Sequence, residues 1–154
     1  TQFGYEILRN TPALNDGVKL AALQHHERID GKGYPLRISG EKIHVYAKIV
    51  AIADMFHAMT MDRVYKMAES PFIALEKLQE ASFGKLAPQM VLTFIHKMMN
   101  LSQGTVVKLS DGRVGRIVFI DNQYPTRPWV SINGTIEQLA KDKQLWIESV
   151  VAVK

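Results

Sequence analysis

The sequence predicts a mainly α-helical protein, in which a helical bundle over residues 1–100 is followed by a small antiparallel β-sheet or barrel over residues 101–154. In the first part, apolar residues recur with helical spacing, and glycine or proline ends the helical runs. From Leu101 onward, short runs rich in β-branched residues alternate with turn sequences such as SDGR and NGT. We therefore expect two domains with these boundaries.

The N-terminal half of the predicted bundle contains three helical patterns. Residues 1–10 resemble the end of a helix already in progress, so we expect the chain to be cut from a longer protein. A second helix covers residues 17–28, and the glycine-rich turn after it ends regular structure. A long helix is predicted over residues 43–66. Its centre, KIVAIADMFHAMTM, is apolar on nearly all sides, which indicates burial in the bundle.

Two more helices complete the predicted bundle. Ser70 and Pro71 supply an N-cap and a first-turn proline for a helix that ends at Gly84. Pro88 opens the last helix, which runs to about Asn100. Its core side is predicted to carry Val91, Leu92, Ile95, Met98 and Met99.

The second part is predicted to form four or five strands. They are expected at residues 105–109, 114–120, 129–132 and 145–153. Trp129 and Trp146 are interpreted as core residues rather than as ligand-stacking residues.

Composition excludes several classes of protein and of site. The chain has 154 residues, is 47% hydrophobic and 22% charged, and contains no cysteine, so a metal would have to be held by histidines and carboxylates. Residues 1–100 carry 12 Lys or Arg against 10 Asp or Glu, and residues 101–154 carry 7 against 5. This even distribution of charge argues against a nucleic-acid partner. No apolar run reaches the ~18 residues of a membrane span.

The motif HHERIDGKGYP, residues 25–35, concentrates polar groups where a helix ends. His25 and His26 differ by about 100° around a helix, so as a pair they are weak evidence for one shared ion. Asp54 adds support, because it lies in an otherwise apolar run and a buried carboxylate needs an ion pair or a metal. Arg28, Lys48 or Arg63 could supply the ion pair, but the nearby histidines favour a metal ligand.

The residues after the histidines are suited to a shaped loop beside a substrate. Asp30, Gly31 and Gly33 allow a tight turn with positive φ, and Tyr34 and Pro35 give it a rigid rim. A purely structural loop is the alternative.

Arg63 and Lys66 lie about one helical turn apart, roughly ten residues after Asp54. Two cations beside a metal cluster suit a phosphodiester, although a solvated helix end would show the same pattern.

HHERIDGKGYP resembles the HHExxDGxGYP signature of the HD-GYP family, and KIVAIADMFHAMTMDRVYKMA resembles the stretch that follows it there. The resemblance implies an HD-superfamily helical bundle and a cyclic di-GMP phosphodiesterase of bacterial signalling, with pGpG or GMP as product. It also implies two or three divalent ions, iron or manganese, and a cytoplasmic enzyme. Residues 101–154 resemble the β appendage of many members.

The resemblance also implies a role for each candidate residue. His25, His26 and Asp54 would be metal ligands, and Asp54 and His26 would take part in catalysis. Substrate or partner contacts would come from Asp30, Gly31, Gly33, Tyr34, Pro35, Arg63 and Lys66. Diguanylate-cyclase-type signalling proteins are expected to bind the loop of residues 30–35, called the GYP loop below. A sensory or receiver domain is expected upstream.

The sequence departs from the family pattern at several points. The His-Asp half of the metal site is expected upstream of Thr1, so we expect the 154-residue chain alone to bind metal poorly and to be inactive. His57 replaces a usual Asp, with a core or supporting role more typical than ligation, and Val64 replaces a usual Pro. An inactive nucleotide sensor or adaptor is the main alternative function. A nucleic-acid module in the β part is a weaker one.

Overall fold

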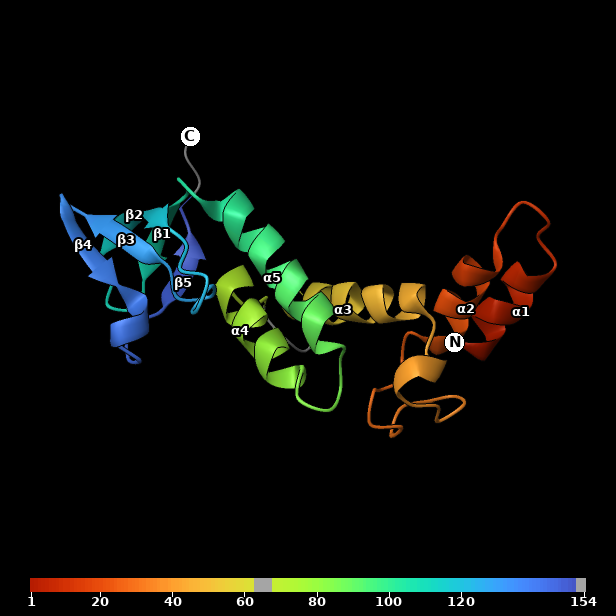
Figure 1. Cartoon of the computed structure of the whole chain (residues 1–154). Coiled ribbons are helices and arrows are strands. Elements are labelled where there is room, and N and C mark those ends of the chain that lie inside the picture. The colour runs from red at the N-terminus through yellow and green to blue at the C-terminus, as the bar shows by residue number, and fades with distance from the viewer. Residues whose placement is uncertain (63–67, 152–154) are drawn as a thin grey trace. The chain divides into compact units, whose positions relative to one another are not determined.

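The computed structural model describes residues 1–62 and 68–151, which contain five α-helices, two short 3-10 helices and five β-strands (Figure 1). The chain divides into two compact units. One consists of Thr1–Ala58 with Leu78–Val91, and the other of Met59–Lys77 with Leu92–Lys154. Each unit therefore contains part of the helical region. The predicted class, helices followed by a small sheet, is confirmed.

The first two helices, α1 (Gln2–Arg9) and α2 (Asp16–Gln24), lie next to each other at the N-terminal end of the first unit (Figure 1). Helix α2 begins at an Asn15 cap, whose side chain accepts a 3.0 Å hydrogen bond from the N–H of Val18. It ends at Gln24, so the histidines follow the helix rather than lying on its face.

Helix α3 (Val45–Thr60) follows a 3-10 turn at Gly40–Lys42. The prediction that this helix is buried on nearly all sides is wrong. Its buried residues are Ala47, Ala51 and Ile52, whose i, i+4, i+5 spacing makes one narrow stripe. Four large apolar side chains on its other faces are 40–52% exposed. They are Val45, Tyr46, Ile49 and Val50.

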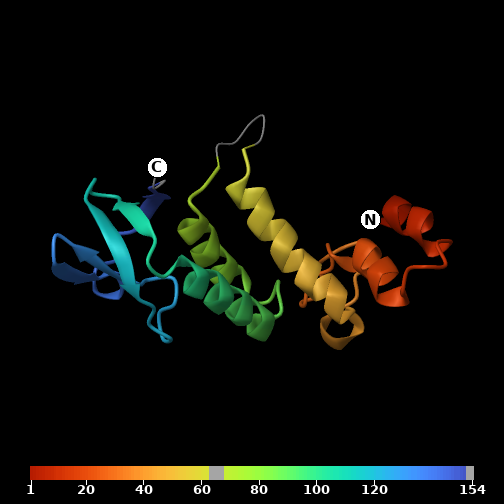
Figure 2. The same ribbon diagram turned by 90° about the horizontal axis from the view of Figure 1, so that it is seen from above.

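Helices α4 (Pro71–Ala81) and α5 (Pro88–Ser102) run antiparallel beside each other (Figure 2). The turn between them includes Gly84 at φ +81°, as its predicted role at the end of a helix requires. The predicted core side of α5 is confirmed at three positions that are 0–1% exposed, and it is wrong at Leu92, which is 39% exposed. The buried three are Val91, Ile95 and Met99, spaced one helical turn apart.

The sheet has the order β4-β3-β2-β1-β5, with every neighbouring pair antiparallel. Its strands are β1 (Val106–Leu109), β2 (Val114–Phe119), β3 (Trp129–Ile132), β4 (Thr135–Gln138) and β5 (Ile147–Val150). The sheet is open rather than a closed barrel, because β4 and β5 form its two edges and do not pair with each other. Strand β4 was not among the four predicted runs. It is the return strand of a hairpin whose turn, Asn133 and Gly134, has the two positive φ angles typical of a type I′ turn.

The two tryptophans are less buried than predicted. Trp146 is 41% exposed, so its assignment to the core is wrong. Its neighbours Leu145 and Ile147 are both buried, and because side chains of an extended segment alternate between faces, the tryptophan between them points outward. Trp129 is half-buried and meets the ring of Phe119 edge-on, with 5.1 Å between ring centroids.

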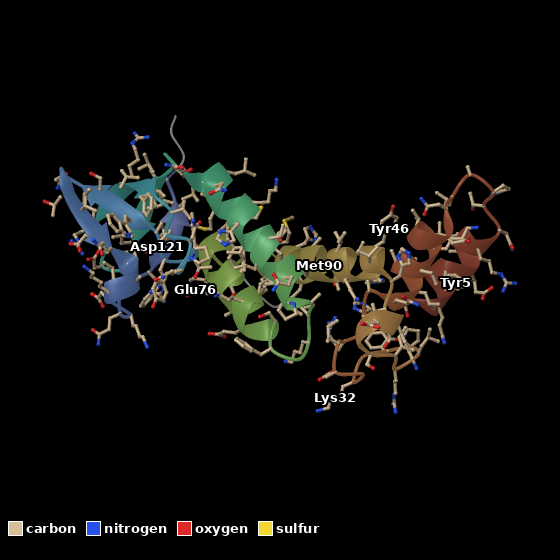
Figure 3. The ribbon with its side chains drawn as sticks, in the orientation of Figure 1. Tyr5, Lys32, Tyr46, Glu76, Met90 and Asp121 are labelled. Carbon is tan, nitrogen blue, oxygen red and sulfur yellow. The ribbon has the colours of Figure 1, made fainter. Side chains whose placement is uncertain are left out.

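Within the second unit, an ion pair joins α4 to the segments around the sheet. The Nε of Arg127 lies 2.6 Å from a carboxylate oxygen of Glu76, labelled in Figure 3, and Nη1 of Arg127 donates to the carbonyl of Leu145 at 2.8 Å. Nearby, the hydroxyl of Ser70 donates to the carbonyl of Ile147 in β5 at 3.1 Å. The start of α4 is therefore held to the sheet by side chains from both sides.

Replacing Arg127 by alanine is expected to lower the free energy of unfolding by about 1–2 kcal/mol, because a half-buried ion pair and a hydrogen bond to a carbonyl are lost together. Urea unfolding followed by circular dichroism measures the change. Lys143→Ala, at an exposed position, is the control and should change stability little. An unchanged unfolding midpoint for Arg127→Ala would show that the contact adds nothing.

Within residues 1–62 and 68–151, no helix combines the length and the apolar character needed to cross a membrane.

Candidate functional site

The histidine pair lies directly after α2. His25 is the C-cap residue of this helix, and its ring centroid is 4.3 Å from that of His26. The Nδ1 of His25 lies 2.9 Å from the carbonyl oxygen of Ala21. Because a carbonyl can only accept, Nδ1 donates this hydrogen bond, and in the neutral tautomer that does so the lone pair is on Nε2. This is the orientation found in metal-binding histidines, whose second nitrogen is usually anchored in this way.

The environment of His26 favours the neutral imidazole. Burial lowers the pKa of His26 below its ordinary value of 6.5, and the neighbouring His25 and Arg28 lower it further. The carboxylate of Asp54 raises the pKa of His26, so Asp54 lies within electrostatic reach of this ring. A neutral imidazole is the form that binds metal ions.

The prediction that Asp54 is buried is wrong, because its side chain is exposed. Seven residues turn a helix by about 700°, so Asp54 lies on nearly the same face of α3 as Ala47. The described residues cover this face at Ala47 and Ala51 and leave it open at Asp54. An apolar run in the sequence therefore does not ensure that every residue within it is buried. Asp54 therefore lies about one helical turn beyond Ala51, at a position that is open to solvent.

The donor types fit a divalent ion: two imidazole nitrogens and a carboxylate suit iron or manganese. In the part of the chain that the structure describes, however, no three His, Cys, Asp or Glu side chains stand close enough to hold an ion together. His25, His26 and Asp54 thus fit a partial ligand set. His57, three residues after Asp54 on α3, is exposed, so its expected core role is wrong.

The loop after the histidines folds back onto them. The Asp30 side chain accepts the N–H of Lys32 at 3.0 Å, and Gly31 takes φ +76°, as predicted. The N–H of Tyr34 donates to the carbonyl of His26 at 3.3 Å. The Tyr34 ring then lies against the His26 ring, with 4.8 Å between centroids and a 33° tilt. Lys32 marks the outer tip of this loop (Figure 3).

Gly33 is required for a different reason from the one predicted. It does not adopt positive φ. Instead, a Cβ at this position would overlap the backbone N of Arg28, the Cα of Glu27 and the carbonyl oxygen of His26. The loop therefore packs directly on the backbone of the histidine segment, and only glycine fits between. Pro35 follows Tyr34 through a cis peptide bond.

A segment distant in sequence supports the same loop. The N–H of Ile29 donates to the carbonyl of Lys85 at 3.1 Å, and that of Asp30 donates to the carbonyl of Gly84 at 2.9 Å. The turn between α4 and α5 thus fixes the start of the loop. Sequence reasoning placed Gly84 only at the end of a helix.

Two buried polar residues that flank the histidines were missed by the sequence reasoning. Gln24 is 6% exposed and Glu27 is 3% exposed. The side-chain oxygen of Gln24 accepts the N–H of His44 at 2.8 Å, which ties the end of α2 to the start of α3. Glu27 lies in the HHERIDGKGYP motif, between the histidines and the glycine-rich loop. A charged residue between two segments that pack together was the signal that could have identified it.

Replacing Gln24 by alanine is expected to destabilise the protein by about 1–2 kcal/mol, since it removes a buried hydrogen bond and leaves the His44 N–H without its acceptor. Because α3 carries Asp54, the affinity of the full-length protein for Mn²⁺ should fall as well if Asp54 is a metal ligand. Thermal unfolding and manganese titration measure the two effects, with Gln2→Ala, at an exposed position on α1, as the control. Equal stabilities for the two variants would contradict the assignment.

Arg63 and Lys66, the predicted phosphate-binding residues, lie outside the described residues.

Residues 1–88, more than half of the chain, match the family model of the HD domain. The chain belongs to the HD domain family. Its HHERIDGKGYP motif and its similarity to cyclic di-GMP phosphodiesterases place it in the HD-GYP group, as the sequence predicted.

Three curated relatives of this HD-GYP chain illustrate the similarity. A cyclic di-GMP phosphodiesterase of Pseudomonas aeruginosa is 35% identical over 96 residues, which is 62% of this chain and 23% of the relative. The cyclic di-GMP phosphodiesterase PdeB of Borreliella burgdorferi is 25% identical over 146 residues, 93% of this chain and 38% of the relative. A 3′3′-cGAMP-specific phosphodiesterase of Vibrio cholerae is 44% identical over 66 residues, 42% of this chain and 13% of the relative. The chain thus spans less than two fifths of each relative's length.

Proposed function

We propose that this HD-GYP chain contributes metal ligands and a substrate-contacting loop to a metal-dependent phosphodiesterase that hydrolyses cyclic di-GMP in bacterial signalling. The observation that carries the proposal is the pair of adjacent imidazoles of His25 and His26, with the carboxylate of Asp54 within electrostatic reach of His26. The expected setting is the bacterial cytoplasm, with a sensory or receiver domain upstream.

In this proposal the chain's residues hold the metal ions and orient the phosphate of the substrate. Divalent ions, two or three in number and iron or manganese in kind, would supply charge neutralisation at the phosphoryl oxygens and an activated water. His25, fixed by the Ala21 carbonyl, presents Nε2, and His26 presents a neutral ring. Asp54 supplies negative charge from the facing helix. Arg63 and Lys66 are proposed to bind phosphate oxygens.

The loop of Asp30, Gly31, Gly33, Tyr34 and Pro35 is proposed to contact the nucleotide. The tyrosine ring is 55% exposed although one of its faces meets His26. An exposed aromatic face beside a phosphate site suits a nucleobase, because every base offers a stacking surface.

The test is turnover by the full-length protein with Mn²⁺ or Fe²⁺. We expect cyclic di-GMP to be cleaved to pGpG and then GMP, and a chelator to abolish turnover until metal is restored. 3′3′-cGAMP, assayed in parallel, decides which cyclic dinucleotide is preferred, since one relative is named for it. No hydrolysis of either substrate with either metal would contradict the proposal.

The 154-residue chain on its own is expected to hold less than one tightly bound ion and to hydrolyse nothing, because the described residues offer only a partial ligand set. Metal analysis after dialysis measures the ion content. Two retained ions per chain would overturn this expectation.

A second function, as a nucleotide sensor or an adaptor for diguanylate-cyclase-type proteins, is favoured by the exposure of the GYP loop. Tyr34 is 55% exposed and Leu36 is 49% exposed, which leaves apolar surface for a partner. A His25→Ala, His26→Ala double variant that keeps its cellular phenotype would support this function. Loss of the phenotype together with hydrolysis would count against it.

A further inference from the structure

We propose that Glu27 is a positioning residue of this site: its buried carboxylate holds the GYP loop so that the Tyr34 ring lies against His26. The contact between Glu27 and the loop does not depend on the reaction that the protein is proposed to catalyse. Its consequence for substrate binding rests on the proposed function. Glu27 is therefore assigned a role through other residues, not contact with the substrate.

The carboxylate of Glu27 binds the loop through one oxygen. Its Oε1 accepts the N–H of Leu36 at 2.6 Å and the N–H of Arg37 at 3.1 Å. Hydrogen bonds to an ionised acceptor are about twice as strong as neutral ones. Both donors lie nine or ten residues further along the chain, so these bonds close the loop onto the residue that follows the histidines.

The burial of this carboxylate points to a function beyond packing. Glu27 is 3% exposed, and among the described residues its Oε2 has no hydrogen-bond partner. Burying a carboxyl group with one oxygen unpaired is costly. An apolar side chain of similar volume would pack without that cost, but it could not accept the two loop N–H groups.

The loop that Glu27 holds contains a residue in an unfavourable backbone conformation. Arg37 has φ +56°, in the left-handed region, where a residue other than glycine is strained. The bond from its N–H to Glu27 offsets this strain. Two residues before Leu36, Tyr34 donates its own N–H to the His26 carbonyl. The loop backbone is thus fixed on both sides of Pro35, and the Tyr34 ring lies against the ring of His26.

Glu27 also borders the helix that carries Asp54. It lines a pocket together with Ala47 and Ala51 of α3, the two alanines whose stripe leads one turn on to Asp54. The histidine segment, the GYP loop and α3 therefore meet at this carboxylate. A change at Glu27 should be felt at the site although Glu27 is neither a ligand nor exposed.

The first test needs no variant. In the unmodified 154-residue chain, amide hydrogen exchange should show protected N–H groups at Leu36 and Arg37, even though both side chains are exposed. Exchange at the rate of an open loop would overturn the proposal.

The second test uses Glu27→Gln and Glu27→Leu, with Glu41→Leu as an exposed control. The readout is the NMR signal of the His26 Cε1–H at alkaline pH, where the ring of His26 is neutral and the Tyr34 ring current shifts the signal. Tyr34→Leu defines the position of the signal without that ring. We expect Glu27→Gln, which keeps an acceptor oxygen, to keep the shift, and Glu27→Leu to lose it. The double variant Glu27→Leu, Tyr34→Leu should match Tyr34→Leu alone.

If both Glu27 variants keep the shift, or both lose it while folded, the carboxylate does not act in the proposed way. In the full-length protein, Glu27→Leu should raise KM for cyclic di-GMP by about tenfold and change kcat less, in line with the effect of a supporting residue. An unchanged KM would remove the link to substrate binding. Absence of turnover in the wild type would contradict the phosphodiesterase and leave the NMR result valid for the contact.

Discussion

Asp54→Ala is expected to lower the rate of cyclic dinucleotide hydrolysis by the full-length protein by at least about 100-fold, the upper end of what the loss of a supporting residue of a metal site produces. The carboxylate of Asp54 raises the pKa of His26 and so acts directly on this ring. Because its side chain is exposed, removal should leave the fold intact. Activity is measured as pGpG release at saturating Mn²⁺, with the apparent metal affinity from a manganese titration.

Asp16→Ala is the matched control, since Asp16 is an exposed carboxylate on α2 in the same unit. It should leave turnover unchanged. Excess manganese should restore part of the activity of Asp54→Ala if the carboxylate serves as a ligand. Full activity of the Asp54→Ala variant without added metal would show that Asp54 is not part of the site.

Gly33→Ala is expected to destabilise the first unit by about 3 kcal/mol, the upper end for overpacking, because the new Cβ would meet backbone that cannot rotate away. The atoms it meets belong to His26, Glu27 and Arg28, so relief requires the loop to lift off the histidine segment. Loss of turnover should therefore accompany loss of stability. Urea unfolding and the hydrolysis assay measure the two effects on one preparation.

Gly4→Ala provides the opposite control. Gly4 lies inside α1, and a Cβ there would meet nothing within 4 Å, so alanine should stabilise the helix by about 0.5–1 kcal/mol. Gly31→Ala is intermediate, because its nearest new contact is an ordinary 3.4 Å but its φ of +76° disfavours a side chain. Equal effects at Gly33 and Gly31 would contradict the expectation that lack of space makes Gly33 the more sensitive position.

The helices and strands were predictable because their signals are local. Helical spacing, the prolines at 71 and 88, and Gly84 located α4 and α5 within a few residues. β-branched runs located four of the five strands. Strand β4 was missed because only two of its four residues, Thr135 and Ile136, are β-branched, and its pairing with β3 decides its conformation. That the sheet stays open also depends on the pairing of strands far apart in sequence.

The candidate site was predictable as a list of residues and not as an arrangement. The motif named His25, His26 and Tyr34 from order alone, since these residues are close along the chain. The exposure of Asp54 was not predictable, because it depends on which parts of the chain cover α3. Gln24 and Glu27 were missed for the same reason, as their partners lie 20 and 9–10 residues away.

The sequence by itself determined the family of this chain, the order of its helices and strands, and the chemical types gathered at its motif. Each of these follows from residues that are neighbours or are spaced by one helical turn. Only the tertiary structure decided which nitrogen of His25 is free, why residue 33 must be glycine, and how a buried glutamate joins three segments. These features depend on contacts between segments that the chain order keeps apart, and hydrogen bonding and packing set them only once the chain has folded.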